Sequence, residues 1–332
     1  MPHQEEIARP VFDMAPDTGA IAGVANRTKT VLPRIVDSVI PREALFLKLD
    51  RLQDAALGLI VGPAGYGKST LTRTWIDRRN VDTAWLTLDA EDNDFDRFAR
   101  FLMIALAEVD LSVVANIRAL ADRPSRPDVH ELAETLADQL GDRDQHLYLV
   151  LDEAEHIGDG DVWAFLQAIV GYRIPRFHLI LISRVDPPMP IGRLRLQQHL
   201  IEIRGEELLF QRDELLTMLS RNADALIEAR ADDLMKATDG WPAGLRLALL
   251  ASGSGIGTQA PSSEDVQARR SFMLDVLAED VFDHIPPADR DAMLVVSIVE
   301  EICPPLSWAD GLQDPEYRPD RQRGHLVHRF LR

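Results

Sequence analysis

The sequence predicts an α/β fold in which a doubly wound parallel sheet is followed by smaller helical domains. Short apolar runs of strand length occur four times before residue 183. Segments with helical periodicity separate these runs, an alternation typical of parallel strands joined by crossover helices. After about Phe210 the strand pattern ceases and helical patterns dominate.

The elements are expected in a definite order. A helix should begin near Pro41, because proline suits the first turn of a helix. A second helix is expected over 69–79, and a helical region over 95–140 that is broken near Pro124 and Pro127. Buried strands are expected at 57–61, 83–88, 147–151 and 178–182.

Composition and charge exclude several classes of function. The 332 residues carry a net charge of −18, and such an acidic surface repels phosphodiester backbones, so no direct nucleic-acid binding is expected from this segment. No run approaches the roughly 18 apolar residues of a membrane span, and the first 30 residues do not resemble a secretory signal. The single cysteine, Cys303, fits a reducing compartment and is expected to be a small buried hydrophobe. We therefore expect a cytoplasmic protein without a membrane partner.

A glycine-rich segment directly follows the first expected strand. Its glycines allow successive backbone N–H groups to surround a β-phosphate, and the helix that follows presents its positive end to the same anion. Lys68 is expected to reach the β- and γ-phosphates, and the Ser69 hydroxyl to bind Mg²⁺. The segment therefore predicts an ATP or ADP site, and the alternative is a glycine-rich turn that binds nothing. It consists of Gly62, Pro63, Ala64, Gly65, Tyr66, Gly67, Lys68, Ser69 and Thr70, which match the P-loop pattern G-x-x-x-x-G-K-[ST] over the first eight positions.

Two further segments are expected at the same edge of the sheet. Asp152 ends the third strand and should be the second Mg²⁺ ligand, while Glu153 should polarise an attacking water. An acidic turn at the end of a strand is the alternative for this pair. Arg184 follows the fourth strand and should contact the γ-phosphate, because ligands lie beyond the carboxyl ends of parallel strands. Its alternative is a solvent-exposed loop arginine.

Together these segments resemble the ATPase module of the large ATP-binding LuxR-class transcription regulators, the maltose-activator branch of the STAND P-loop NTPases. The resemblance covers roughly residues 31–300. It implies that Lys68, Ser69 and Asp152 hold Mg-ATP and that Arg184 senses the γ-phosphate. The matching residues are Pro41, Arg42, 62–71, Trp75, Trp85, Leu86, Leu88, Asp89, Asp92, Asn93, Phe95, Phe98, Leu102, 149–153, His156, Ser183, Arg184, 186–188, Leu194, Arg195, 200–204, Leu209, Phe210 and 240–245.

The resemblance also implies a contact to the adenine base. In the family, a G-x-P segment lies in a small helical domain and its proline, here Pro242, packs on the adenine. Ile40 and Pro41 would lie opposite. From the residues alone, Gly240 to Pro242 also fits a plain helix start with Trp241 in a core.

The expected domains follow from these assignments and from a small-residue linker. They are a flexible N-terminal segment (1–30), a P-loop nucleotide-binding domain (31–212), a small helical domain (213–252), the linker (253–264) and a helical, partial winged-helix-like domain (265–332).

Three features depart from the family pattern. Glu153 stands where members often have a second aspartate. Gly324 stands where the family has a histidine that reads ADP, and a shift of one residue would let His325 replace it. The family's sensor repeats and C-terminal helix-turn-helix do not occur in these 332 residues. The resemblance is thus to the ATPase module, and neither a small-molecule inducer nor target genes can be identified.

The leading hypothesis is an ATP/ADP-gated switch of a transcription regulator, with slow ATP hydrolysis that resets it. Its expected partners are further copies of itself or full-length regulator homologues. An alternative is a non-catalytic nucleotide-binding module that co-assembles with full-length regulators as a decoy. A third hypothesis is a small-molecule kinase, in which Arg193 and Arg195 would belong to a lid.

Overall fold

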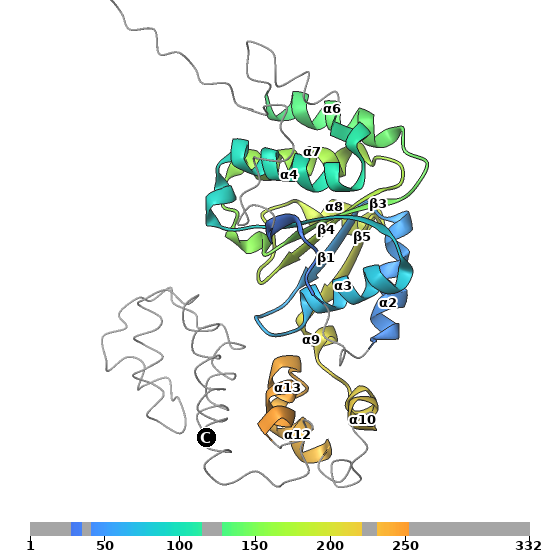
Figure 1. Ribbon diagram of the computed structural model, residues 1–332, viewed down its shortest axis with the longest axis vertical. Helices are drawn as coiled ribbons and strands as arrows, with labels where there is room; N and C mark the ends of the chain where they lie inside the picture. Colours follow the sequence, from blue (N-terminus) through green and yellow to red (C-terminus); the bar gives the residue numbers. More distant parts are fainter. Residues whose placement is uncertain (1–27, 35–40, 115–127, 221–230, 252–332) are drawn as a thin grey trace, which may run out of the picture. The chain divides into compact units, whose positions relative to one another are not determined.

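A computed structural model describes residues 28–34, 41–114, 128–220 and 231–251 (Figure 1). The chain separates into two compact units, Met1–Arg221 and Asn222–Arg332, each of which is described by itself. The domain boundaries expected from the sequence stay predictions. Within the described ranges, no helix is long and apolar enough to cross a membrane.

Several expectations concern residues outside the described ranges. They are the first 27 residues of the expected flexible segment (1–30), the break near Pro124 and Pro127, Ile40, the linker at 253–264, and the last domain with Cys303, Gly324 and His325. The last three residues of the expected flexible segment, 28–30, are helical.

Five parallel strands form the sheet of the first unit, in the order β2-β3-β4-β1-β5 (Figure 1). This confirms the α/β class and the four predicted strands. Leu200–Arg204 is a fifth strand that the sequence analysis did not predict. The strands are Leu57–Val61 (β1), Asp82–Thr87 (β2), Leu147–Asp152 (β3), Phe177–Ser183 (β4) and Leu200–Arg204 (β5).

Helices cover both faces of this sheet (Figure 1). Along β1, the side chains of Leu57, Leu59 and Val61 pack in one core with α4, α6 and α7, whereas Ile60 packs in a second core with α2 and α3. This alternation along a buried strand is what a three-layer fold requires. The helices are α2 (Glu43–Asp50), α3 (Lys68–Arg79), α4 (Phe95–Val109), α6 (Val129–Gly141), α7 (Gly160–Tyr172), α8 (Ile191–Leu196), α9 (Gly205–Leu208) and α10 (Arg212–Ser220), with short 3₁₀ turns η1 (Arg51–Asp54), η2 (Ala90–Asn93) and η3 (Ala154–His156).

Local sequence explains where the principal helices begin. Asp94 caps α4 by accepting a hydrogen bond from the backbone N–H of Arg97 at 2.8 Å. Asp159 caps α7 in the same way through Asp161 and Val162. The helix predicted near Pro41 is α2, with Arg42 at its N-cap position, so Pro41 precedes the helix and is not in its first turn.

The described part of the second unit is a helical pair, α12 (Ala231–Thr238) and α13 (Pro242–Ala251). Pro242 is the first residue of α13, and Trp241 is buried, as the plain helix start predicted. A Cβ on Gly244 would lie 2.6 Å from Cε3 of Trp241, so only glycine lets the indole ring approach this closely.

Candidate functional site

The predicted phosphate-binding segments meet at the carboxyl edge of the sheet. The P-loop follows β1, Asp152 ends β3 and Arg184 follows β4, which lies between β1 and β3. Because all these strands are parallel, their carboxyl ends lie along one edge. A direct link joins β4 to the loop, since the N–H of Gly62 donates to the carbonyl of Ser183 at 3.2 Å.

The P-loop takes the backbone conformation that its glycines allow. Gly65 and Gly67 have φ values of 72° and 76°, in the left-handed region that residues with a Cβ seldom adopt. Gly67 is the N-cap of α3, and within the described residues no side chain caps this helix. The first amides of a helix lack partners inside the helix, so an uncapped N-terminus after a turn of this kind suits an anion.

Lys68 folds back over this loop. Its Nζ donates to the carbonyl oxygens of Gly62 at 2.7 Å and of Pro63 at 3.0 Å. Burial lowers the pKa of Lys68, and the charges of Glu155 and Asp152 oppose that shift while Arg184 adds to it. Within the described part of the chain, Lys68 forms no ion pair, so the direct partners of its ammonium group are two neutral carbonyls. A half-buried cation in this state fits an anionic ligand such as a polyphosphate.

Ser69 and Asp152 are in direct contact. The Ser69 hydroxyl donates to Oδ1 of Asp152 at 2.9 Å. Burial raises the pKa of Asp152 to about 6, with the Ser69 hydrogen bond lowering it and the nearby charge of Glu153 raising it. A buried carboxylate beside a hydroxyl is a donor set that fits Mg²⁺, a cation that prefers oxygen ligands.

Glu153 lies at a tight turn after β3. Its φ of 60° and ψ of 39° place it in the left-handed region, which is uncommon for a residue other than glycine. Its N–H donates to Oδ1 of Asp152 at 3.0 Å. The side chain is 47% exposed, and its Oε2 lies 3.7 Å from Nε2 of His156. Strained backbone of this kind persists only where neighbouring contacts hold it.

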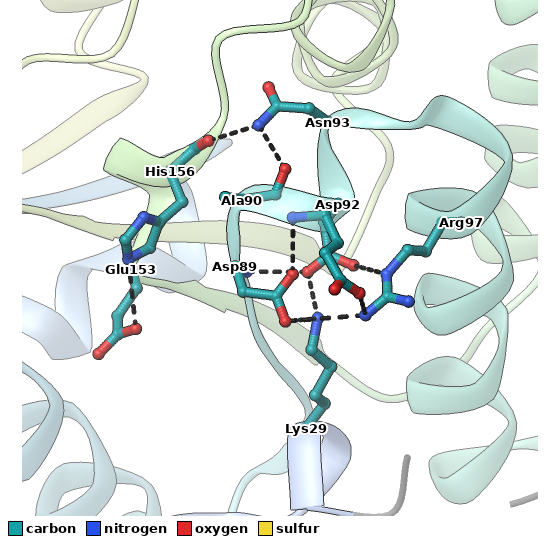
Figure 2. Close-up of polar contacts among 9 residues, drawn as sticks. Lys29, Asp89, Ala90, Asp92, Asn93, Arg97, Glu153 and His156 are labelled. Atoms are coloured by element: carbon teal, nitrogen blue, oxygen red, sulfur yellow. Dashed lines mark hydrogen bonds and ion pairs between the residues drawn. The ribbon is translucent and has the colours of Figure 1, made fainter. Parts of the chain in front are cut away.

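Asn93 supplies such contacts (Figure 2). Its Nδ2 donates to the carbonyls of Ala90 at 2.9 Å and of His156 at 2.8 Å. Its Oδ1 accepts from the N–H groups of Gly158 at 2.7 Å and Asp159 at 3.0 Å. One amide side chain therefore ties η2 to the turn that follows Asp152. From the sequence, Asn93 was only one of the residues that match the family.

The turn η2 is itself anchored by the buried carboxylate of Asp92 (Figure 2). Lys29 Nζ lies 2.5 Å from Oδ2 of Asp92, and Arg97 Nε lies 3.2 Å from its Oδ1. The N–H of Asp89 donates to Oδ2 at 2.9 Å. A fully buried carboxylate needs partners of this kind, and here they fix the loop that carries Asn93.

Arg184 has a partner that the sequence analysis missed. Its Nε lies 2.9 Å from Oε1 of Glu155, and its backbone N–H donates to Oε2 at 3.0 Å. Both side chains are largely buried, at 23% and 12% exposed. The only signal in the sequence was an acid three residues after Asp152. Arg184 is thus held in place rather than extended into solvent.

The remaining predicted residues are placed as follows. Tyr66 is half-buried and Thr70 exposed, on either side of Lys68. Pro242 lies in the second unit, so the expected adenine contact stays a prediction.

The sheet order, the P-loop after β1 and the acid at the end of β3 define the fold of the P-loop NTPases. Residues 50–186 match the family described as "AAA domain". Over 267 residues the chain is 30% identical to the HTH-type transcriptional regulator MalT of Vibrio parahaemolyticus, covering 79% of this chain and 29% of that protein. MalT of Klebsiella pneumoniae is 28% identical over 284 residues, covering 83% of this chain and 31% of its own length.

These findings confirm the resemblance predicted from the motifs, because residues 50–186 match an AAA domain and most of the chain is similar to a part of the MalT regulators. The chain spans less than a third of the length of these relatives.

Solved structures with distant likeness include Cdc6p from Pyrobaculum aerophilum, with a TM-score of 0.47 and 16% identity over 83% of this chain and 77% of that one. Aeropyrum pernix Orc1, solved in complex with DNA, has a TM-score of 0.45 and 17% identity over 81% and 75% of the two chains. The assignment of the fold rests on this chain's own sheet order and P-loop.

Proposed function

We propose that this chain binds ATP and ADP with Mg²⁺ and acts as the nucleotide-gated module of a transcription regulator. The contact between Ser69 and Asp152 at 2.9 Å carries the proposal, because it joins the P-loop to the end of β3 where a metal ion needs both. The MalT relatives are HTH-type transcriptional regulators, which supports the wider role.

The proposed roles follow from the contacts. The amides of 62–70 surround the phosphates, and Lys68 exchanges its two carbonyl contacts for phosphate oxygens. Ser69 and Asp152 hold Mg²⁺, which supplies charge neutralisation to the phosphates when it is bound.

The switch depends on the γ-phosphate. A ligand shifts an equilibrium only by its difference in affinity for the two states, so one residue must distinguish ATP from ADP. We assign this role to Arg184, at the end of the strand that contacts Gly62. ADP holds the module closed, and ATP, together with an inducer, opens it for self-association or for assembly with full-length homologues. Slow hydrolysis resets the switch.

The non-catalytic alternative is favoured by one observation. The Glu153 side chain, proposed to activate water, is 47% exposed and lies beside His156. If the Glu153 carboxylate stayed beside His156 when nucleotide binds, the module would bind nucleotide without hydrolysing it.

Glu153→Gln tests the proposed chemistry. Loss of a general base typically costs about 10²–10⁴-fold in rate, so hydrolysis of Mg-ATP should fall at least to that extent while ADP affinity is unchanged. The measurement is phosphate release under multiple turnover, with Glu134→Gln, an exposed residue on α6, as the control. If the wild type binds ATP without hydrolysing it, the non-catalytic module is the better description. Equal rates for Glu153→Gln and wild type would remove Glu153 from the mechanism.

A further inference from the structure

Glu155 makes two contacts to a single residue. Its Oε2 accepts the backbone N–H of Arg184 at 3.0 Å, and its Oε1 lies 2.9 Å from Nε of the same arginine. We propose that Glu155 is a positioning residue that holds the Arg184 side chain at the phosphate site, and that it thereby sets the preference of the module for ATP over ADP. This inference rests on the proposed function and specifies how its γ-phosphate sensor is built.

The two contacts restrain Arg184 strongly. An arginine side chain has several rotatable bonds and loses much rotational freedom when it must take one geometry. A carboxylate that bonds both the main chain and Nε of one arginine fixes most of that geometry before a ligand arrives. Within the described residues, the two terminal nitrogens of Arg184 form no hydrogen bond, so their donors remain for phosphate oxygens.

Glu155 is itself held firmly. It lies in the turn η3 between Ala154 and His156. Asn93 donates to the His156 carbonyl at 2.8 Å (Figure 2). The backbone N–H of His156 donates to the carbonyl of Glu153 at 3.1 Å. With a side chain only 12% exposed, Glu155 has little room to take another position.

The pair also lies beside the P-loop. Arg184 directly follows Ser183, whose carbonyl accepts from the N–H of Gly62 at 3.2 Å. The charge of Glu155 raises the pKa of Lys68 and that of Arg184 lowers it, so both groups act on the lysine of the P-loop. An unpaired Glu155 carboxylate here would repel a γ-phosphate, and Arg184 neutralises it. ATP should therefore depend on the intact pair far more than ADP does.

The test compares ADP with a non-hydrolysable β,γ-imido analogue of ATP, both titrated calorimetrically with Mg²⁺ into the full chain. For Glu155→Ala we expect binding of the ATP analogue to weaken about tenfold, within the usual range of coupling between sites, and ADP affinity to stay within about twofold. Arg184→Ala should weaken the analogue at least as much. The double variant should be no weaker than Arg184→Ala alone, because the two residues act as one unit.

Two further variants serve as controls. Glu155→Gln keeps the size of the side chain but has only one oxygen acceptor, so it should give a smaller loss than Glu155→Ala. Glu134→Ala removes an equal charge from an exposed position on α6 and should leave both affinities unchanged.

If Glu155→Ala still binds nucleotide and the ratio of its affinities for the ATP analogue and ADP is unchanged, the role of Glu155 is overturned. The proposed function is not affected by that result. Tighter binding of the ATP analogue would also overturn the role of Glu155, since Glu155 would then compete with the γ-phosphate for Arg184. If the wild type binds neither nucleotide, the proposed function itself falls, and the inference with it.

Discussion

Replacing Arg42 with alanine should destabilise the first unit by about 3–5 kcal/mol, the usual cost of removing one partner from a buried ion pair. Arg42 is 8% exposed. It pairs with Glu214 through Nε at 2.8 Å and Nη2 at 2.9 Å. It also donates to the carbonyls of Leu208 at 2.6 Å, Leu209 at 2.8 Å and Glu207 at 3.2 Å. Alanine would leave a carboxylate and three carbonyls without this partner.

Urea unfolding monitored by circular dichroism checks this expectation. Arg42→Lys keeps the charge but not the fork of donors, so its loss should be intermediate. Arg78→Ala is the control, because its pair with Glu43 is exposed and pairs of that kind contribute about 0–1 kcal/mol. If Arg42→Ala were no less stable than Arg78→Ala, the buried pair would not stabilise the junction of α2 with α9 and α10.

Asp152→Asn should have the opposite effect on stability. We expect the nucleotide-free variant to be more stable than wild type by about 3 kcal/mol at pH 8, as a shift of about two pKa units implies. Burial raises the pKa of Asp152 to about 6, so the folded protein opposes its ionisation. The hydrogen bonds from Ser69 at 2.9 Å and from the N–H of Glu153 at 3.0 Å both reach Oδ1, which asparagine retains.

The sign of the pH dependence follows from the direction of this shift. A carboxyl whose pKa is raised on folding binds more protons in the native state, so ionisation destabilises the protein. The free energy of unfolding of wild type should therefore fall as the pH rises from about 4 to about 6, relative to Asp152→Asn, and the difference should be constant above that window.

Urea unfolding at several pH values tests this, with Asp77→Asn, which changes an exposed carboxylate, as the control. Asp152→Asn should also lose the Mg²⁺-dependent part of nucleotide affinity. The account would be contradicted if Asp152→Asn were no more stable than wild type at pH 8. It would also be contradicted if the variant were stabilised equally at pH 4 and pH 8.

The fold was largely predictable because its signals are local. Strands β1, β3 and β4 are continuous apolar runs, and the P-loop follows the first of them. Strand β5 escaped prediction because its apolar run is interrupted by Glu202 between Ile201 and Ile203. That glutamate is compensated by Arg195 and Arg204, each with an N–O distance below 3 Å, a pairing that depends on the fold. The order of the strands likewise depends on tertiary contacts.

Some residues of the candidate site were also predictable from local sequence, and others were not. Lys68, Ser69 and Asp152 were predicted because each stands in a recognisable pattern next to a strand. Glu155 and Asn93 were not assigned roles, because their contacts join separate segments: Glu155 reaches Arg184 after β4, and Asn93 reaches His156 after β3. A single sequence contains no direct signal for such pairs.

Calorimetric titration of ATP and ADP, each with Mg²⁺, into wild type and Lys68→Ala tests the central claim most directly. We predict that wild type binds both nucleotides and that Lys68→Ala weakens binding about a hundredfold, as expected when a charged hydrogen-bond donor is removed from a phosphate site. Absence of binding by wild type, or equal affinity of Lys68→Ala, would contradict the assignment of the P-loop as a nucleotide site.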